Sequence, residues 1–159
     1  MIGAVDIGGT KIAVGAVDDD GKVHARSETP TDGQNYSAGL EAIVQMLKGI
    51  SAGSNVRVRG IGIGATGPVD PISGEFGDVD FLPGWRGKNL VQDLESAFKV
   101  RAAMENDGDA AALAEAGWGA GRNRTRLIYI KPGFSVGASL DGRRIPQEIM
   151  PGAGIKLAR

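Results

Sequence analysis

Glycine is the residue that most constrains how this chain can fold. The sequence contains 26 glycines among 159 residues, well above the roughly 7% of an average protein. Many of them stand beside short apolar runs, as in the Gly8-Gly9 pair and in the alternation from Gly60 to Gly64. Because glycine in such positions marks turns, the pattern predicts short strands closed by tight turns.

The size and charge of the chain limit the classes of protein that it can belong to. Its length is near that of one ordinary domain, and 42% hydrophobic with 23% charged residues predict a folded core. The net charge of -1, without a Lys/Arg-rich run, argues against nucleic acid as a partner. The absence of cysteine excludes disulfides and zinc sites built from cysteine.

Apolar stretches are short throughout the sequence. Ile128 to Ile130 is among the longest, far below the roughly 20 residues that a membrane helix needs. The start of the chain, Met1 to Ala4, lacks the apolar segment of a signal peptide. We therefore expect a cytoplasmic protein that does not span a membrane.

The periodicity of apolar residues predicts an α/β protein with a mixed order of elements. We expect strands at 2–6, 12–17 and 22–29 that form a three-stranded meander, a helix at 36–50, a strand at 56–63, loops at 64–74 and 77–87, a helix at 90–98 capped by Asn89, a strand at 100–104, an alanine-rich helix at 107–118 and a strand at 127–130. In the second loop, Phe81, Leu82 and Trp85 are expected to anchor the chain against the body of the protein.

The first candidate for chemistry is the segment from Asp6 to Lys11. Its paired glycines, Gly8 and Gly9, let backbone N–H groups approach a phosphate closely, Thr10 adds a hydroxyl, and Lys11 adds a charge if it points inward. The alternative is a plain hairpin whose glycines serve only the turn. Neither the P-loop pattern nor the dinucleotide pattern is present, so this motif alone does not decide between the two.

The second candidate is the glycine-rich segment from Gly60 to Asp70, which includes Gly67 and Pro68. Its small residues allow the backbone to lie against a ligand. Tight packing of a glycine-rich strand against a helix explains the same composition equally well.

The third candidate is the run from Met104 to Asp109, where a strand ends in polar residues and a helix begins. Ligands of open α/β sheets bind at such strand ends. Asp107 is suited to accept the proton of a substrate hydroxyl while Asn106 orients the substrate, and the helix dipole favours an ionised carboxylate there. Simple capping of the helix by Asn106 or Asp107 is about equally consistent with the sequence.

Taken together and in this order, four segments resemble the ROK family of bacterial sugar kinases and repressors. They are Asp6-Ile7-Gly8-Gly9-Thr10-Lys11, Gly62 to Asp70, Leu82-Pro83-Gly84-Trp85-Arg86-Gly87-Lys88-Asn89-Leu90, and Glu105-Asn106-Asp107 running into Ala110 to Glu115. The resemblance covers about residues 1–130. It implies a lobe of the actin-like ATPase (ribonuclease H-like) fold, a mixed sheet with a three-stranded meander flanked by helices. Residues 1–121 would form the N-terminal lobe, and 122–159 the start of a second lobe with an atypical tail.

The resemblance implies phosphoryl transfer from ATP and Mg²⁺ to the 6-hydroxyl of a hexose or N-acetylhexosamine. By position, Asp6, Gly8, Gly9, Thr10 and Lys11 would lie at the nucleotide phosphates, with Asp6 near the metal. Gly67 and Pro68 would line the sugar pocket, Asn106 would bind sugar hydroxyls, and Asp107 would bind the sugar and act as general base. Gly133 would belong to a second phosphate loop.

Several positions depart from the family pattern. The second phosphate loop reads Gly133-Phe134-Ser135-Val136-Gly137, with phenylalanine and serine where the family has small residues, and Asp109 replaces an asparagine. The family's Gly-Glu-Ile-Gly-His segment and its zinc-binding cysteines are absent from the sequence. A complete member has about twice this length. The tail from Arg144 to Arg159 has no helical or strand period, and we expect an out-of-frame or premature end there.

These departures leave three interpretations open. The first is the N-terminal lobe of an ATP-dependent sugar kinase. The second is a non-catalytic sugar-binding or regulatory module. Because the phosphate motif begins at residue 6, we do not expect the winged helix of the family's repressors ahead of it. The third is a structural actin-like fragment that forms homo-oligomers through an exposed strand of the second lobe.

Overall fold

The computed structural model describes residues 1–54, 57–131, 135–140 and 143–144. They belong to two compact units, Met1–Asp107 and Gly108–Arg159. The lobe boundary after residue 121 remains a prediction of the sequence. Residues 145–159, which make up nearly all of the tail expected to be atypical, lie outside the described residues.

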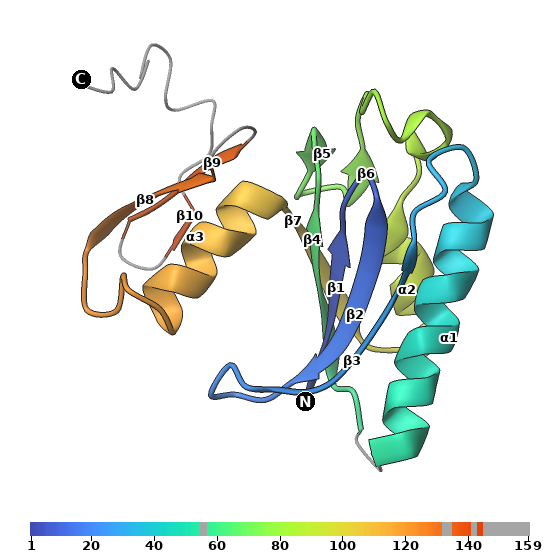
Figure 1. Ribbon diagram of the computed structural model, residues 1–159, viewed down its shortest axis with the longest axis horizontal. Helices are drawn as coiled ribbons and strands as arrows, with labels where there is room; N and C mark the ends of the chain where they lie inside the picture. The colour runs from blue at the N-terminus through green and yellow to red at the C-terminus, as the bar shows by residue number, and fades with distance from the viewer. Residues whose placement is uncertain (55–56, 132–134, 141–142, 145–159) are drawn as a thin grey trace. The chain divides into compact units, whose positions relative to one another are not determined.

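A five-stranded mixed sheet forms the centre of the first unit (Figure 1). Its strands are β1 (Ile2–Ile7), β2 (Lys11–Val17), β3 (Val23–Pro30), β4 (Gly60–Ala65) and β7 (Arg101–Asn106), in the spatial order β3-β2-β1-β4-β7. The first three strands pair antiparallel, which confirms the predicted meander, whereas β4 and β7 run parallel to β1.

Helices α1 (Tyr36–Ser54) and α2 (Leu90–Phe98) confirm two of the predicted helices. In Figure 1 both lie on the same side of the sheet. The side chain of Asn89 accepts a hydrogen bond from the backbone N–H of Gln92, so Asn89 caps α2 as the sequence predicts. The cap defines where α2 begins, and the apolar side chains of α1 and α2 pack both helices against the sheet.

The two faces of the sheet differ in composition. Alternate residues of the strands, such as Val5, Ile7, Ile12, Val14 and Ile63, are buried in one hydrophobic cluster with the apolar residues of α1 and α2. The opposite face carries mainly glycine, alanine and charged residues because side chains alternate along each strand. Burial of the first set explains the stability of the layer formed by sheet and helices.

The segment between β4 and α2 contains structure that the sequence did not predict. It holds the short strands β5 (Val69–Asp70) and β6 (Glu75–Phe76), which pair with each other, and the 3₁₀ turn η1 (Pro83–Trp85). Leu82 and Trp85 are fully buried there, as expected of anchors. The predicted strand at 56–63 starts later, at Gly60, because β4 pairs residue by residue with the six residues of β1.

Trp85 anchors this segment through two edge-to-face aromatic contacts and a hydrogen bond. Its ring meets Tyr36 and Phe76 edge to face, at centroid distances of 5.1 and 5.2 Å. Its indole N–H donates to the carbonyl of Asp32 at 3.0 Å. A Cβ on Gly39 of α1 would collide with the indole, so glycine lets α1 pass directly over Trp85.

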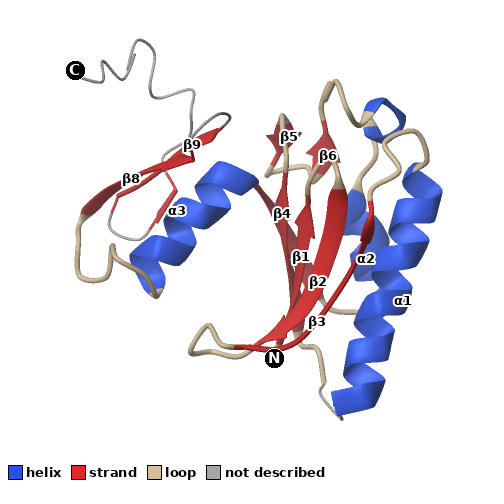
Figure 2. Cartoon of the chain, in the orientation of Figure 1, coloured by secondary structure: helices blue, strands red, loops and turns tan. Residues whose placement is uncertain are grey.

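The second unit contains most of α3 (Asp107–Gly117) and the strands β8 (Arg126–Lys131), β9 (Ser135–Leu140) and β10 (Arg143–Arg144). The strands form an antiparallel sheet in the order β10-β9-β8 (Figure 2). Both α3 and β8 match elements expected from the sequence. Among the residues that the structure describes, none of the helices is both long and apolar enough to cross a membrane.

Tyr36 gives a test of the packing between α1 and α2. Its hydroxyl donates to a carboxylate oxygen of Asp93 in α2, and burial together with this carboxylate raises the pKa of Tyr36 well above its usual 10.0. We expect Tyr36→Phe to lower the free energy of unfolding by about 1.5–3 kcal/mol at neutral pH, measured by urea denaturation.

The same urea denaturation, repeated at higher pH, tests whether the effect of Tyr36→Phe comes from the hydrogen bond of the protonated hydroxyl. In the unfolded chain Tyr36 ionises near pH 10, whereas in the folded chain it stays protonated, so its contribution is complete below pH 10 and is lost as the pH rises above it. The stability difference between Tyr36→Phe and the parent chain should therefore shrink above pH 10. A difference that stays constant up to pH 11 would contradict this.

Candidate functional site

Three parallel strands end at the same level of the first sheet. Ile7 at the end of β1 pairs with Ala65 at the end of β4, and Ala65 pairs with Asn106 at the end of β7. The three segments that follow these strands therefore begin at one edge. Because ligands of open α/β sheets bind beyond the carboxyl ends of their strands, this edge is the candidate site.

The segment after β1 is a tight hairpin made by Gly8, Gly9 and Thr10. The backbone N–H of Gly8 donates to the carbonyl of Lys11 at 2.9 Å, which closes the turn. The N–H groups of Gly9 and Thr10 donate to no acceptor in the part of the chain that the structure describes. Two adjacent backbone donors at the tip of a turn are the kind of group that binds a phosphate oxygen.

Gly67 and Asn106 lie in contact although they come from different strand ends. A Cβ on Gly67 would lie 2.6 Å from the side-chain nitrogen of Asn106. The neighbouring residue, Pro68, accepts a hydrogen bond at 2.9 Å from the backbone N–H of Gly77. The structure therefore brings together Gly67, Pro68 and Asn106, which the sequence analysis assigned to the sugar pocket.

Asn106 is the last residue of β7 and Asp107 the first residue of α3. Both are half-buried. The sudden change from strand to helix comes from the sequence, because the short polar residues Asn106, Asp107 and Asp109 precede an alanine-rich stretch with high helix propensity. An amide and a carboxylate thus follow each other where a strand meets a helix, with their backbone fixed by both elements.

Asp6 and Lys11 lie on the sheet face that α1 and α2 do not cover. Asp6 is exposed, and its register partner in β4 is Gly64, whose own partner in β7 is Glu105. The carboxylates of Asp6 and Glu105 therefore lie on the same face, separated only by a residue without a side chain.

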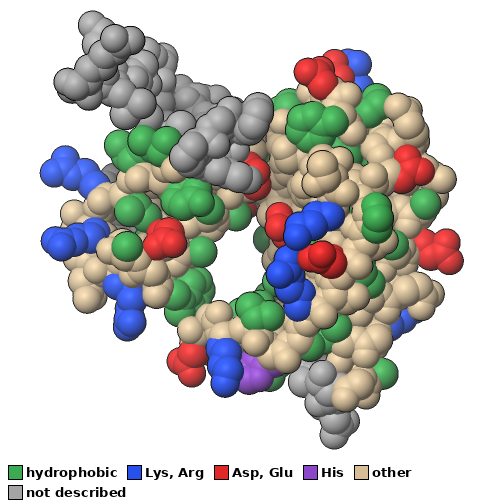
Figure 3. All heavy atoms as spheres, viewed as in Figure 1, with side chains coloured by type: hydrophobic (Ala, Val, Ile, Leu, Met, Phe, Trp, Pro, Cys, Tyr) green, Lys and Arg blue, Asp and Glu red, His purple; other side chains and the backbone are tan. Residues whose placement is uncertain are grey.

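The ammonium group of Lys11 lies 3.2 Å from a carboxylate oxygen of Glu28 on β3, which also pairs with Arg26 at 3.1 Å. Figure 3 shows acidic and basic side chains gathered side by side over the first unit. The structure thus places Lys11 in a surface ion-pair group, with about half of each side chain of the Lys11–Glu28 pair exposed. Its role at the nucleotide phosphates remains a prediction.

The donor set of the site fits a magnesium ion that is shared with phosphate groups. Mg²⁺ in such sites takes one or two carboxylates, and phosphate oxygens and water complete its shell. Asp6 offers one exposed carboxylate at the end of β1. Among the described residues, no group of three or more His, Asp or Glu side chains could hold a metal ion.

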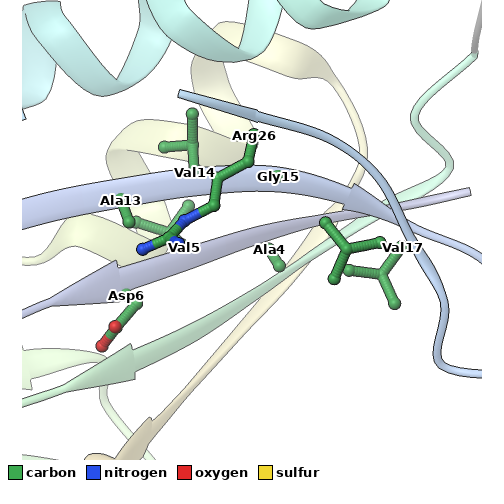
Figure 4. A pocket seen from close by; sticks show the side chains of 9 residues that line it. Ala4, Val5, Asp6, Ala13, Val14, Gly15, Val17 and Arg26 are labelled. Carbon is green, nitrogen blue, oxygen red and sulfur yellow. The ribbon is translucent and has the colours of Figure 1, made fainter. Parts of the chain in front are cut away.

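A cavity of about 320 Å³ opens on the same face of the sheet, farther from the strand ends. Figure 4 shows its lining side chains on β1, β2 and β3, with Asp6 and Arg26 among mainly small apolar residues. The lining includes Asp6 but not the hairpin tip, Gly67 or Asn106. The cavity therefore does not coincide with the edge where the other candidate residues meet.

Two residues that contact the hairpin had no predicted role in the site. Thr31 donates two hydrogen bonds to it, and the ring of Phe81 lies on Gly9. The sequence named Phe81 only as an anchor, and no motif singled out Thr31. Gly133, assigned to a second phosphate loop, lies outside the described residues.

The fold and the edge of the sheet define the class of protein. The arrangement is that of the actin-like ATPase fold, which the solved relatives share. A model of the family described as "ROK family" matches residues 2–145. The chain belongs to the ROK family.

Individual relatives are sugar kinases. The chain is 33% identical to a glucokinase of Streptomyces coelicolor over 86% of its own length and 42% of the relative. It is 34% identical to an N-acetyl-D-glucosamine kinase of Salmonella paratyphi C over 70% of its length and 36% of the relative. A Streptomyces griseus ROK glucokinase, solved with glucose and AMPPNP, matches with a TM-score of 0.76 and 31% identity over 89% of this chain and 45% of that one. The chain thus spans less than half of these relatives.

Gly67→Ala tests the contact between two strand ends. The added Cβ would lie 2.6 Å from the side-chain nitrogen of Asn106 and must displace that amide. We expect a clear change in the NMR signals of the Asn106 side-chain NH₂ group. Gly49→Ala is the matched control, because a Cβ on Gly49 meets nothing within 4 Å. Unchanged Asn106 signals in Gly67→Ala would show that the two loops are not in contact.

Proposed function

We propose that this chain carries the catalytic edge of an ATP-dependent sugar kinase that phosphorylates the 6-hydroxyl of a hexose or N-acetylhexosamine. One observation carries the proposal. The level ends of β1, β4 and β7 bring the hairpin donors, the contact between Gly67 and Asn106, and the carboxylate of Asp107 to one edge of the sheet. The similarity to glucokinases and to an N-acetylglucosamine kinase supports both classes of sugar.

Each group at this edge has a task in the proposed reaction. The backbone N–H groups of Gly9 and Thr10 hold phosphate oxygens, and Asp6 offers a carboxylate to the magnesium ion. Gly67, Pro68 and Asn106 line the sugar, with Asn106 bonded to its hydroxyls. Asp107 accepts the proton of the attacking 6-hydroxyl.

Bound ATP supplies the phosphoryl group, and Mg²⁺ neutralises part of its charge. The chain itself therefore has little covalent chemistry to perform. Its contribution is to hold the hydroxyl and the phosphate in line and to receive one proton. Regular secondary structure suits this task because it fixes the backbone. The phosphate hairpin and the loop with Gly67 follow the ends of β1 and β4, and Asp107 begins α3.

The second candidate is a module that binds a sugar without transferring phosphate. It is favoured by the contact between Gly67 and Asn106, the residues assigned to the sugar, which does not involve the phosphate hairpin.

The experiment is a measurement of ADP release by the 159-residue chain with ATP and Mg²⁺, in the presence of glucose, mannose, N-acetylglucosamine or N-acetylmannosamine. We expect release that depends on the sugar. Asp107→Asn should lower it by about 10²- to 10⁴-fold, because an amide keeps the shape of the side chain but cannot take the proton. Sugar affinity, measured by calorimetry, should change little.

Asp20→Asn is the matched control, since Asp20 is an exposed carboxylate in the turn between β2 and β3. It should leave both readouts unchanged. Full turnover in Asp107→Asn would remove Asp107 from the role of base. Sugar binding without ADP release by the parent chain would favour the binding module.

A further inference from the structure

Thr31, the first residue after β3, is hydrogen-bonded to the phosphate hairpin formed by Gly8, Gly9 and Thr10. The hydroxyl of Thr31 donates to the carbonyl of Gly8 at 2.8 Å, and its backbone N–H donates to the carbonyl of Thr10 at 3.1 Å. These two bonds join both sides of the turn to a single residue. With the bond from Gly8 to Lys11, the carbonyls of Gly8, Thr10 and Lys11 are all satisfied inside the protein.

The ring of Phe81 covers the hairpin on another side. A Cβ on Gly9 would lie 2.7 Å from Cδ2, 3.1 Å from Cε2 and 3.3 Å from Cγ of Phe81. Three neighbouring ring atoms thus lie against the Cα of Gly9. The side chain remains 51% exposed, so it gains little from burial, although its ring lies against the glycine of the phosphate hairpin.

The backbone of Phe81 is fixed by its neighbours on both sides. Its carbonyl is so close to Gly33 that a Cβ there would collide with it. The next residue, Leu82, is fully buried and donates its N–H to the carbonyl of Val79 at 2.9 Å. Gly84 donates to the carbonyl of Gly33 at 2.9 Å, which ties the two loops together. The backbone that carries the ring of Phe81 is therefore fixed in place.

We propose that Thr31 and Phe81 are positioning residues that clamp the hairpin in its phosphate-binding conformation before a nucleotide arrives. The inference rests on the proposed function, in which Gly9 and Thr10 receive phosphate oxygens. A pair of adjacent glycines loses much conformational freedom when it is ordered, and a ligand that must order it binds more weakly. Because Thr31 and Phe81 order the hairpin when the chain folds, the N–H groups of Gly9 and Thr10 are already in position when a nucleotide binds.

The test compares Thr31→Val and Phe81→Ala with the parent chain in two measurements. The first is amide hydrogen exchange of Gly8 without nucleotide, because its N–H closes the turn. The second is the dissociation constant for AMPPNP with Mg²⁺, measured by calorimetry. Each variant should speed the exchange of Gly8 and weaken AMPPNP binding by about fivefold or more, the effect of losing one ordinary hydrogen bond or a comparable contact.

Matched controls separate the clamp from general destabilisation. Thr29→Val removes a threonine hydroxyl two residues earlier, on β3, and Ile72→Ala removes an exposed apolar side chain from another loop. Both should leave the two readouts unchanged. Thr31→Ser and Phe81→Tyr keep the hydroxyl and the ring, and they should restore behaviour close to that of the parent chain even if Thr31→Val or Phe81→Ala folds poorly.

The outcomes are distinct for the two proposals. Unchanged Gly8 exchange and unchanged AMPPNP affinity in Thr31→Val and Phe81→Ala would overturn the clamp. Equal loss in the controls would overturn it as well, because the effect would then be one of stability alone. Failure of the parent chain to bind AMPPNP would contradict the proposed function, and Gly8 exchange would still decide whether Thr31 and Phe81 hold the hairpin.

Discussion

The parallel pairing of β1 with β4, and of β4 with β7, is the constraint on which the rest of the structure depends. The register places Ile7, Ala65 and Asn106 in one row, so three separate loops start from the same edge. A slip of one residue in either pairing would turn the buried side chains of that strand outward and would separate its loop from the other two. The apolar side chains that α1 and α2 cover therefore stabilise the core and align the candidate site at the same time.

The segment between β6 and α2 connects the core to the site. Trp85 is buried between Tyr36 and Phe76, and from this anchor the chain extends to Phe81 on the hairpin. Near the other end of the segment, the backbone N–H of Gly77 donates a hydrogen bond to the carbonyl of Pro68, in the loop that follows β4. Because Trp85 belongs to the hydrophobic core, packing in the core helps to determine where the hairpin after β1 and the loop after β4 lie.

Much of the fold could be predicted from the sequence because the signals are local. The turns of the meander, the apolar stripe beginning at Tyr36 and the cap at Asn89 each depend on residues close together in the chain. The start of β4 could not be predicted, since it depends on pairing with β1. The same holds within the site: Lys11 pairs with Glu28 across two strands, and Thr31 meets the hairpin only after three strands have paired. Motifs point to the groups that we propose to carry chemistry, whereas the residues that contact and position them are determined by long-range packing.

The most direct test of the central claim is an NMR titration of the 159-residue chain, first with AMPPNP and Mg²⁺ and then with glucose or N-acetylglucosamine. The account predicts that the nucleotide shifts the backbone amide signals of Gly9 and Thr10, and that the sugar shifts the side-chain signals of Asn106. Signals from the cavity on the open face, such as those of Ala4 and Val23, should move little. Absence of shifts at the hairpin and at Asn106, or shifts confined to that cavity, would contradict the assignment of this edge as the site.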